Sequence, residues 1–177
     1  MELAAYGPDR THHTRRLTPP DLPALQRLFE QAADYFEATA GAPPAADEAQ
    51  RAFVGGPPTK AVNEKLTIGV FDRDTALVGV LDAIPDFPAD GTCTIGLLLL
   101  DPAARGAGLG GATLAAFEAW VSRRGATRFR TAVVAPLERA LRFLDRQGYR
   151  EVSRLDGYAA APHRPALVLL EKEGEGN

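Results

Sequence analysis

The sequence contains one cysteine, Cys93, among its 177 residues. A single thiol cannot form an intramolecular disulfide, and a four-cysteine zinc site is excluded. Long apolar segments are also missing, since the longest strongly apolar run, Ile95–Leu100, is far short of the ~20 residues that span a bilayer. The N-terminal residues lack the apolar stretch of a secretory signal. The sequence therefore predicts a cytoplasmic protein that does not bind a membrane.

An excess of positive charge is absent as well. The formal net charge is −3, which gives no indication of a nucleic-acid partner. The charge is nevertheless uneven, because residues 101–154 hold ten arginines and five acids, whereas residues 1–50 hold four arginines and eight acids. Two interpretations stay open: the arginines form ordinary solvated surface, or some of them attract a polyanionic small molecule.

The remaining composition, 45% hydrophobic and 24% charged, is that of an ordinary globular chain of one domain. We place this domain at residues 15–173, after a loose arm over 1–14 and before a frayed tail over 174–177. Apolar periodicity predicts helices over about 21–38, 45–53, 110–124 and 136–147. Strands are predicted over 15–18, 66–72, 76–84, 93–101, 129–135, 149–155 and 166–172. This order predicts an α/β (α+β) architecture around one sheet that is covered on both faces.

The most informative stretch joins the apolar strand 93–101 to the helix 110–124, and it reads Arg105-Gly106-Ala107-Gly108-Leu109-Gly110-Gly111. Its small residues leave the backbone N–H groups unobstructed. The helix N-terminus adds four unpaired donors and about half a positive charge. Together these features predict a binding site for a phosphate or diphosphate, with Leu109 pointing the other way, into the core.

The same glycines allow other interpretations. Residues 106–111 satisfy the dinucleotide-binding pattern G-x-G-x-x-G. Against that fold, the preceding strand ends several residues before the first glycine, and no acid follows strand 129–135 to hold a ribose hydroxyl. A P-loop is rejected because Gly-Lys-Ser/Thr does not occur. A third alternative is that the glycines only shape a tight turn, although four glycines in six positions exceed what a turn requires.

Two segments resemble motifs of the GNAT superfamily of N-acetyltransferases. Arg105-x-x-Gly108-x-Gly110 is similar to its acyl-CoA-binding motif, Arg/Gln-x-x-Gly-x-Gly/Ala. About 40 residues on, Ala140-Leu-Arg-Phe143-Leu-Asp-Arg-Gln-Gly148-Tyr149 resembles its second signature, A-x-x-F-[Y/W]-x-x-x-G-[F/Y]. The resemblance implies a mixed, mostly antiparallel sheet of about six or seven strands with about four helices on its two faces.

The resemblance also implies an activity. Strands 94–100 and 129–135 would splay apart, with acyl-CoA between them as co-substrate. The backbone of Leu98, Leu99 and Leu100 would pair with the pantetheine arm, and the amides of residues 105–111 would wrap the diphosphate. The implied reaction is direct transfer of an acetyl group from acetyl-CoA to a primary amine of a small molecule or peptide. The resemblance leaves a homodimer open.

The sequence departs from the family pattern at three catalytic positions. Leu144 stands where many relatives have a tyrosine, Leu137 where many have an asparagine, and Thr94 near the place of a glutamate. The acid and base are therefore not assigned, and Asp82 and Tyr35 are the candidates. Tyr158 and His163 are expected to be surface residues, and no metal site is expected. Two alternatives to the N-acyltransferase remain: a CoA-binding or sensor protein without turnover, and an O-acyl or longer-chain transferase.

Overall fold

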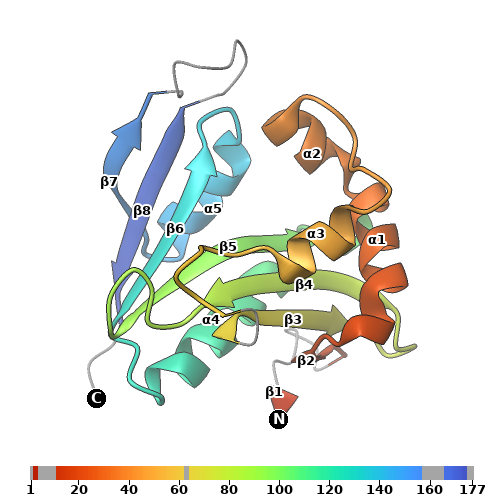
Figure 1. Ribbon diagram of the computed structural model, residues 1–177, viewed down its shortest axis with the longest axis horizontal. Coiled ribbons are helices and arrows are strands. Elements are labelled where there is room, and N and C mark those ends of the chain that lie inside the picture. The colour runs from red at the N-terminus through yellow and green to blue at the C-terminus, as the bar shows by residue number, and fades with distance from the viewer. Residues whose placement is uncertain (1, 4–10, 62–63, 157–165, 175–177) are drawn as a thin grey trace.

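The computed structural model describes residues 2–3, 11–61, 64–156 and 166–174. These residues form one eight-stranded sheet with the order β1-β2-β3-β4-β5-β6-β8-β7 (Figure 1). Only β5 and β6 are parallel, and all other neighbours are antiparallel. The strands are β1 (Glu2–Leu3), β2 (His13–Arg16), β3 (Leu66–Phe71), β4 (Leu77–Ile84), β5 (Thr92–Leu100), β6 (Arg128–Val134), β7 (Arg150–Leu155) and β8 (Leu167–Glu173). The mixed, mostly antiparallel sheet is confirmed.

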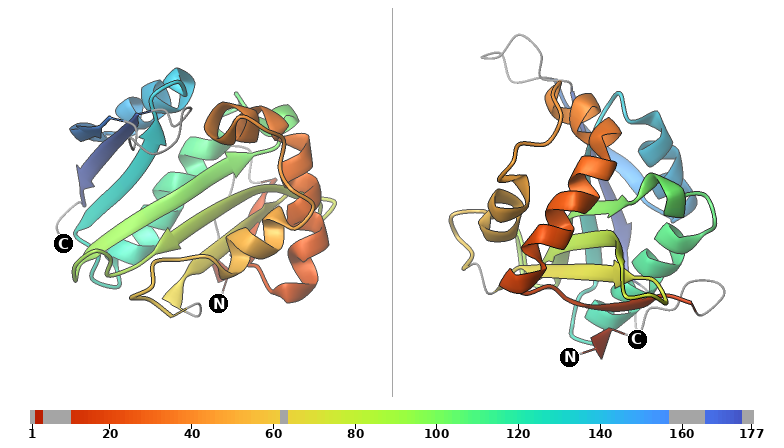
Figure 2. Two further views of the ribbon diagram at one scale, coloured as in Figure 1. Left: turned by 45° about the horizontal axis from the view of Figure 1, so that its top comes forward. Right: turned by 90° about the vertical axis from the view of Figure 1, so that its right-hand side faces the viewer.

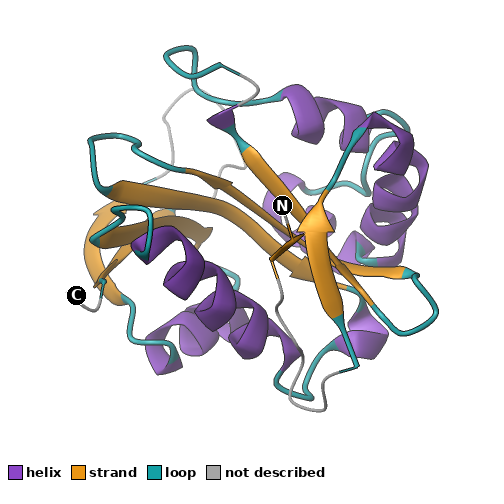
Figure 3. Cartoon of the chain, turned by 90° about the horizontal axis from the view of Figure 1, so that it is seen from below, coloured by secondary structure: helices purple, strands orange, loops and turns teal. Residues whose placement is uncertain are grey.

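Helices cover both faces of this sheet (Figures 2 and 3). They are α1 (Leu22–Gln31), α2 (Ala33–Ala40), α3 (Glu48–Val54), α4 (Leu109–Ser122) and α5 (Glu138–Arg146), with short 3-10 turns at Pro19–Asp21 and Pro102–Ala104. Two apolar clusters fill the space between sheet and helices. One joins α4 and α5 to the sheet around Leu81 and Phe129, and the other joins α1, α2 and α3 around Val80 and Leu99. Alternate residues of β4 thus point to opposite faces.

The helix predicted over 21–38 is two helices, because the backbone leaves helical geometry at Ala32, with φ −97° and ψ 35°. Leu28, Ala32 and Phe36 are all buried in the same cluster. The rings of Phe29 and Phe36 pack at 5.1 Å. The apolar spacing continues through the break, so periodicity predicts one helix where there are two.

The described parts of residues 1–14 are not a loose arm, which corrects the expectation from sequence. Glu2–Leu3 pairs with β2, and β2 pairs with β3. Thr14 is fully buried, and the ring of His13 stacks on Phe71 at 5.3 Å. Strand β2 carries four polar residues, so its stability comes from backbone pairing and not from an apolar pattern that a sequence would show.

None of the helices in the described ranges is long and apolar enough to cross a membrane.

Candidate functional site

Strands β5 and β6 separate partway along their length. They pair only through Thr92–Ile95 and Arg128–Thr131. Beyond this point β5 stays paired with β4 as far as Leu100, and β6 stays paired with β8 as far as Val134. Figure 2 shows the two strands diverging. Within the described chain, no strand pairs with residues 96–100 on the β6 side, so a backbone edge stands open there.

A bulge in β5 marks the point of separation. Asp82 of β4 faces Leu97 and Ala83 faces Ile95, so Gly96 is an extra residue on β5 without a partner in β4. Gly96 is exposed. A Cβ added there would meet only the Asp82 carbonyl oxygen, at 3.8 Å. Bulges of this kind re-aim the backbone and are over-represented beside active sites.

The glycine loop follows the open end of β5. Gly106 and Gly108 have φ values of +90° and +85°, which strongly favour glycine. Residues 106–108 are exposed, whereas Leu109 is buried and anchors the start of α4 in the core. No acceptor for the amides of residues 106–108 lies in the described ranges, and the first amides of α4 have no partner within the helix. This arc of donors suits an anion.

The side chain of Arg105 is bound to the protein itself. Its Nε donates to the Leu100 carbonyl at 2.9 Å, and its two terminal nitrogens contact the two carboxylate oxygens of Asp34 at 2.5 and 3.0 Å. The Arg105 guanidinium lowers the pKa of the Asp34 carboxyl. The loop is therefore tied to the end of β5 and to α2 by Arg105, and the backbone is the part that faces outward.

A pocket of about 280 Å³ lies next to the bulge, on the face covered by α3. Small residues at the end of α3 form one wall, and strands β4 and β5 form the floor. Its polar side chains are those of Lys65, Asp82 and Thr94, and Gly96 lines it without a side chain. The pocket is therefore bordered by the same stretch of β5 that loses its partner strand.

Lys65 and Asp82 form an ion pair in this pocket. Lys65 Nζ lies 2.8 Å from Asp82 Oδ2 and donates to the carbonyls of Ala52 and Gly55, the latter at 2.8 Å. The exposed fractions of the two side chains are only 9% and 17%. Burial raises the pKa of the Asp82 carboxyl, and the Lys65 ammonium offsets part of that rise. Lys65 thus ties the last carbonyls of α3 to β4.

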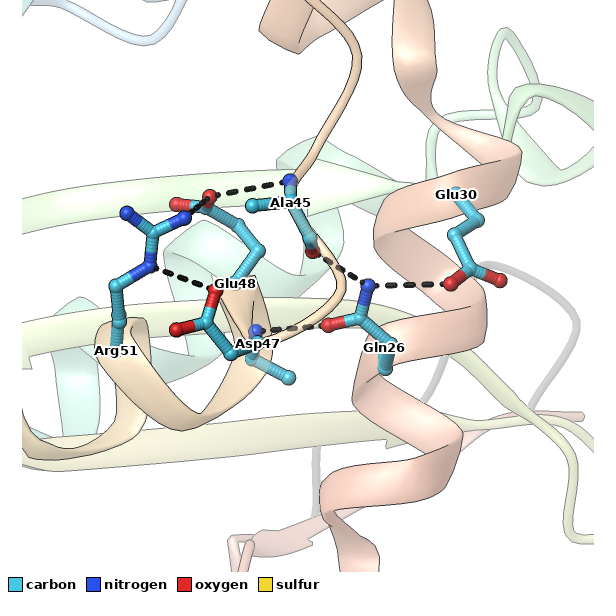
Figure 4. Close-up of polar contacts among 7 residues, drawn as sticks. Gln26, Glu30, Ala45, Asp47, Glu48 and Arg51 are labelled. Atoms are coloured by element: carbon cyan, nitrogen blue, oxygen red, sulfur yellow. Dashed lines mark hydrogen bonds and ion pairs between the residues drawn. The ribbon is translucent and has the colours of Figure 1, made fainter.

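A second network holds α3 against α1 (Figure 4). The Gln26 side-chain amide donates to the Ala45 carbonyl at 2.9 Å and to Glu30 at 3.1 Å, and its oxygen accepts from the Ala49 amide at 3.0 Å. Arg51 pairs with Asp47 and Glu48 on the outer side of α3. These contacts fix the helix that forms the pocket wall.

Of the two catalytic candidates proposed from sequence, one lies in the pocket and the other does not. Asp82 lines the pocket, whereas Tyr35 is not among its lining residues and packs edge-on against Phe36 at 5.2 Å. The Thr94 hydroxyl donates to the Phe87 carbonyl at 2.6 Å, and Leu144 is buried between α5 and the sheet. Tyr158 and His163 lie outside the described residues.

Sequence reasoning missed Lys65 and Gly96. The pairing of β3 with β4 places Thr67 opposite Asp82, so the hairpin register was the signal that could have brought Lys65 close to Asp82. Gly96 does carry a local signal, because an isolated glycine inside an apolar strand is typical of a bulge or of close backbone approach.

Comparisons with known proteins agree with this geometry. The family model described as the acetyltransferase (GNAT) family matches residues 25–149. A comparison with curated protein sequences finds no match. Among solved structures, the chain is similar to an acetyltransferase from Thermus thermophilus, with a TM-score of 0.74 and 25% identity over 92% of this chain and 97% of that one.

Two further solved structures share the fold at lower identity. One is a GCN5-related N-acetyltransferase from Kribbella flavida, with a TM-score of 0.70 and 21% identity over 93% of this chain and 99% of that one. The other is the ribosomal-protein-S18-alanine N-acetyltransferase from Escherichia coli, with a TM-score of 0.68 and 16% identity over 94% of this chain and 96% of that one. The chain belongs to the acetyltransferase (GNAT) family.

Proposed function

We propose that this acetyltransferase uses acetyl-CoA and transfers the acetyl group directly to a primary amine. The observation that carries the proposal is the junction of the open β5 edge with the exposed amides at the start of α4. An extended pantetheine arm needs a strand edge, and a diphosphate needs an arc of N–H donors. Both lie next to each other on consecutive segments of the chain.

In this proposal the backbone of Leu98, Leu99 and Leu100 pairs with the pantetheine arm. The amides of Gly106, Ala107, Gly108, Leu109, Gly110 and Gly111 hold the diphosphate. The amide of Arg105, also expected there from the sequence, donates to the Pro102 carbonyl at 3.3 Å and closes the turn before the loop. Coenzyme A fits the loop because Gly106 and Gly108 add no side chain to the exposed arc. When bound, acetyl-CoA supplies an activated acyl group as a thioester.

The bulge offers a backbone hydrogen-bond donor to the reacting thioester. A backbone N–H beside Gly96 would donate to the thioester carbonyl as negative charge develops on its oxygen, and one such donor is worth ~3–4 kcal/mol of barrier. Holding the amine in the neighbouring pocket against the acyl carbon supplies much of the remaining acceleration. The pocket beside Gly96 is the place for that amine.

The acceptor is proposed as a small molecule or a peptide terminus with a primary amine. The pocket of about 280 Å³ is large enough for an aminoalkyl group or one short residue. Similar structures include a ribosomal-protein-S18-alanine N-acetyltransferase and a spermidine N-acetyltransferase chimera, which support a search among amines of both kinds.

A sensor without turnover is the second candidate. It is favoured by what stands at two positions where many relatives have catalytic side chains. Leu144 is buried and apolar, and the Thr94 hydroxyl is committed to the Phe87 carbonyl. The two candidates differ in one result, the release of free thiol.

The test measures thiol release from acetyl-CoA in the presence of spermidine, alaninamide, serinamide or phosphinothricin. The proposal expects at least one amine to accelerate release and to gain an acetyl group that mass spectrometry detects. Tight CoA binding with no amine-dependent release would favour the sensor, and failure to bind CoA would contradict both candidates.

A further inference from the structure

Asp82 lies beside the proposed point of acetyl transfer. It faces Leu97 across the β4–β5 ladder, immediately next to the bulge residue Gly96. Asp82 and Gly96 both line the pocket. The carboxylate and the open backbone edge therefore border one small space from two neighbouring strands.

The carboxylate has acceptor capacity that the protein does not use. Asp82 Oδ2 is bound by Lys65, but Oδ1 is buried and has no hydrogen-bond partner in the part of the chain that the structure describes. A buried oxygen of this kind is uncommon, since nearly all buried polar atoms in native proteins are paired. An amine N–H entering the pocket is the kind of donor that this carboxylate lacks.

The other polar groups of the pocket are committed. The Lys65 ammonium has three donors, and its contacts are the Ala52 carbonyl, the Gly55 carbonyl and Asp82. The Thr94 hydroxyl donates to Phe87. Lys60, which lines the adjoining pocket, pairs with Glu64 at 3.4 Å. Among the described residues that line the two pockets, Asp82 is the only carboxylate.

We propose that Asp82 is the general base of the acetyl transfer and that Lys65 positions it. As the C–N bond forms between the amine and the acetyl carbon, the C–S bond of the thioester breaks. The amine proton passes to the Asp82 carboxylate and from there to the leaving thiolate, so that CoA leaves as the free thiol. The base thus lies on β4 and not at the Thr94 position of β5.

The electrostatics agree with this role. Burial raises the pKa of the Asp82 carboxyl, and a carboxylate with a higher pKa is a stronger base. Lys65 opposes part of that rise and so favours the ionised form, which is the form that accepts a proton. An isolated carboxyl in the same place would be protonated over a wider pH range and unable to accept a proton there.

The inference rests on the proposed function and is tested by Asp82→Asn, with Asp74→Asn in the exposed β3–β4 turn as the control. The assay is thiol release from acetyl-CoA with the most active amine of the panel, measured as kcat/KM across pH. Asp82→Asn is expected to lower kcat/KM about 100-fold at high pH, because a general base typically contributes ~100-fold or more to the rate. Its affinity for CoA and the rates of Asp74→Asn should stay those of the wild type.

The ratio of variant to wild-type rate is the decisive quantity, because the ionisation of the amine itself cancels in it. The ratio should approach one at low pH, where the wild-type carboxyl is protonated, and fall as the pH rises. A merely structural role would lower the rate equally at every pH. A ratio that does not change with pH overturns the inference and leaves the proposed function intact.

Two further variants keep the test decisive. If Asp82→Asn does not fold, Asp82→Ser is measured in its place, and a ratio to the wild-type rate that does not change with pH would overturn the inference. In Lys65→Met the rate should begin to rise at a higher pH than in the wild type, since the pKa of Asp82 rises further without its cation. A wild type that binds CoA but releases no thiol with any amine overturns the proposed function and this inference together.

Discussion

Gly108 and Gly125 lie at opposite ends of α4 and offer a matched pair of substitutions. Their φ values are +85° and +103°, in the left-handed region that residues with a Cβ avoid. An alanine at either position pays ~1–2 kcal/mol of backbone strain. For a chain of this length each kcal/mol lowers Tm by about 2–4 °C, so both variants should melt about 2–8 °C below the wild type. A Cβ at Gly125 meets nothing within 4 Å, so strain is its whole effect.

Only Gly108 belongs to the proposed diphosphate arc. Relaxation of its φ would turn the neighbouring amides away, so we expect Gly108→Ala to lose about tenfold in CoA affinity, or ~1.4 kcal/mol. Saturating CoA at 100 times Kd stabilises a protein by ~2.7 kcal/mol. The wild type and Gly125→Ala should therefore show the full upward shift of Tm with CoA, and Gly108→Ala about half of it at the same concentration.

Gly108→Glu extends the series, because its carboxylate would repel the diphosphate, and CoA binding should disappear. Calorimetric titration of the folded variants gives the affinities directly. Unchanged CoA affinity in folded Gly108→Glu would refute the proposed arc, and an equal loss of affinity in Gly125→Ala would show that strain in α4 and not contact with the ligand is responsible.

Three further predictions concern stability. Leu144→Ala should lose ~2–5 kcal/mol in denaturant unfolding, because it leaves a cavity in the cluster under α5, while kcat per folded molecule stays the same; a stable but slow enzyme would contradict this. Tyr149→Phe should lose ~1–3 kcal/mol, because the buried Glu118 loses the hydroxyl that donates to it at 2.6 Å, and an unchanged unfolding midpoint would argue against that bond. The pKa of Asp21 is lowered by Arg15 and by Thr18, so its contribution to the free energy of unfolding is present above its unfolded pKa of about 4 and lost as pH falls below it. Asp21→Asn should flatten that pH dependence, and an unaltered slope would rule out the pair.

The parts of the fold that sequence predicted are those with a local signal. Strand β5 is a continuous apolar run, and α4 and α5 end near Gly125 and Gly148, which have positive φ values. The loop of residues 105–111 was visible because four of its seven residues are glycines. These features need no knowledge of the rest of the chain.

The parts that could not be predicted depend on contacts between distant segments. Arg105 and Asp34 are 71 residues apart, and nothing near either residue indicates the pair. Lys65 reaches Ala52 and Gly55 because α3 lies over the sheet, where the Gln26 network and the apolar cluster hold it. Asp82 could be named as a candidate from strand alternation, but its pairing and its burial required the structure.

The most direct test of the account is a titration of isotope-labelled protein with CoA, followed by NMR of the backbone amides. The account predicts that the largest shifts fall on residues 106–111 at the start of α4 and on residues 97–100 along the open edge of β5. It also predicts that pantetheine, which lacks the diphosphate, perturbs only the strand. Saturation with CoA that leaves both groups of amides unmoved would contradict it.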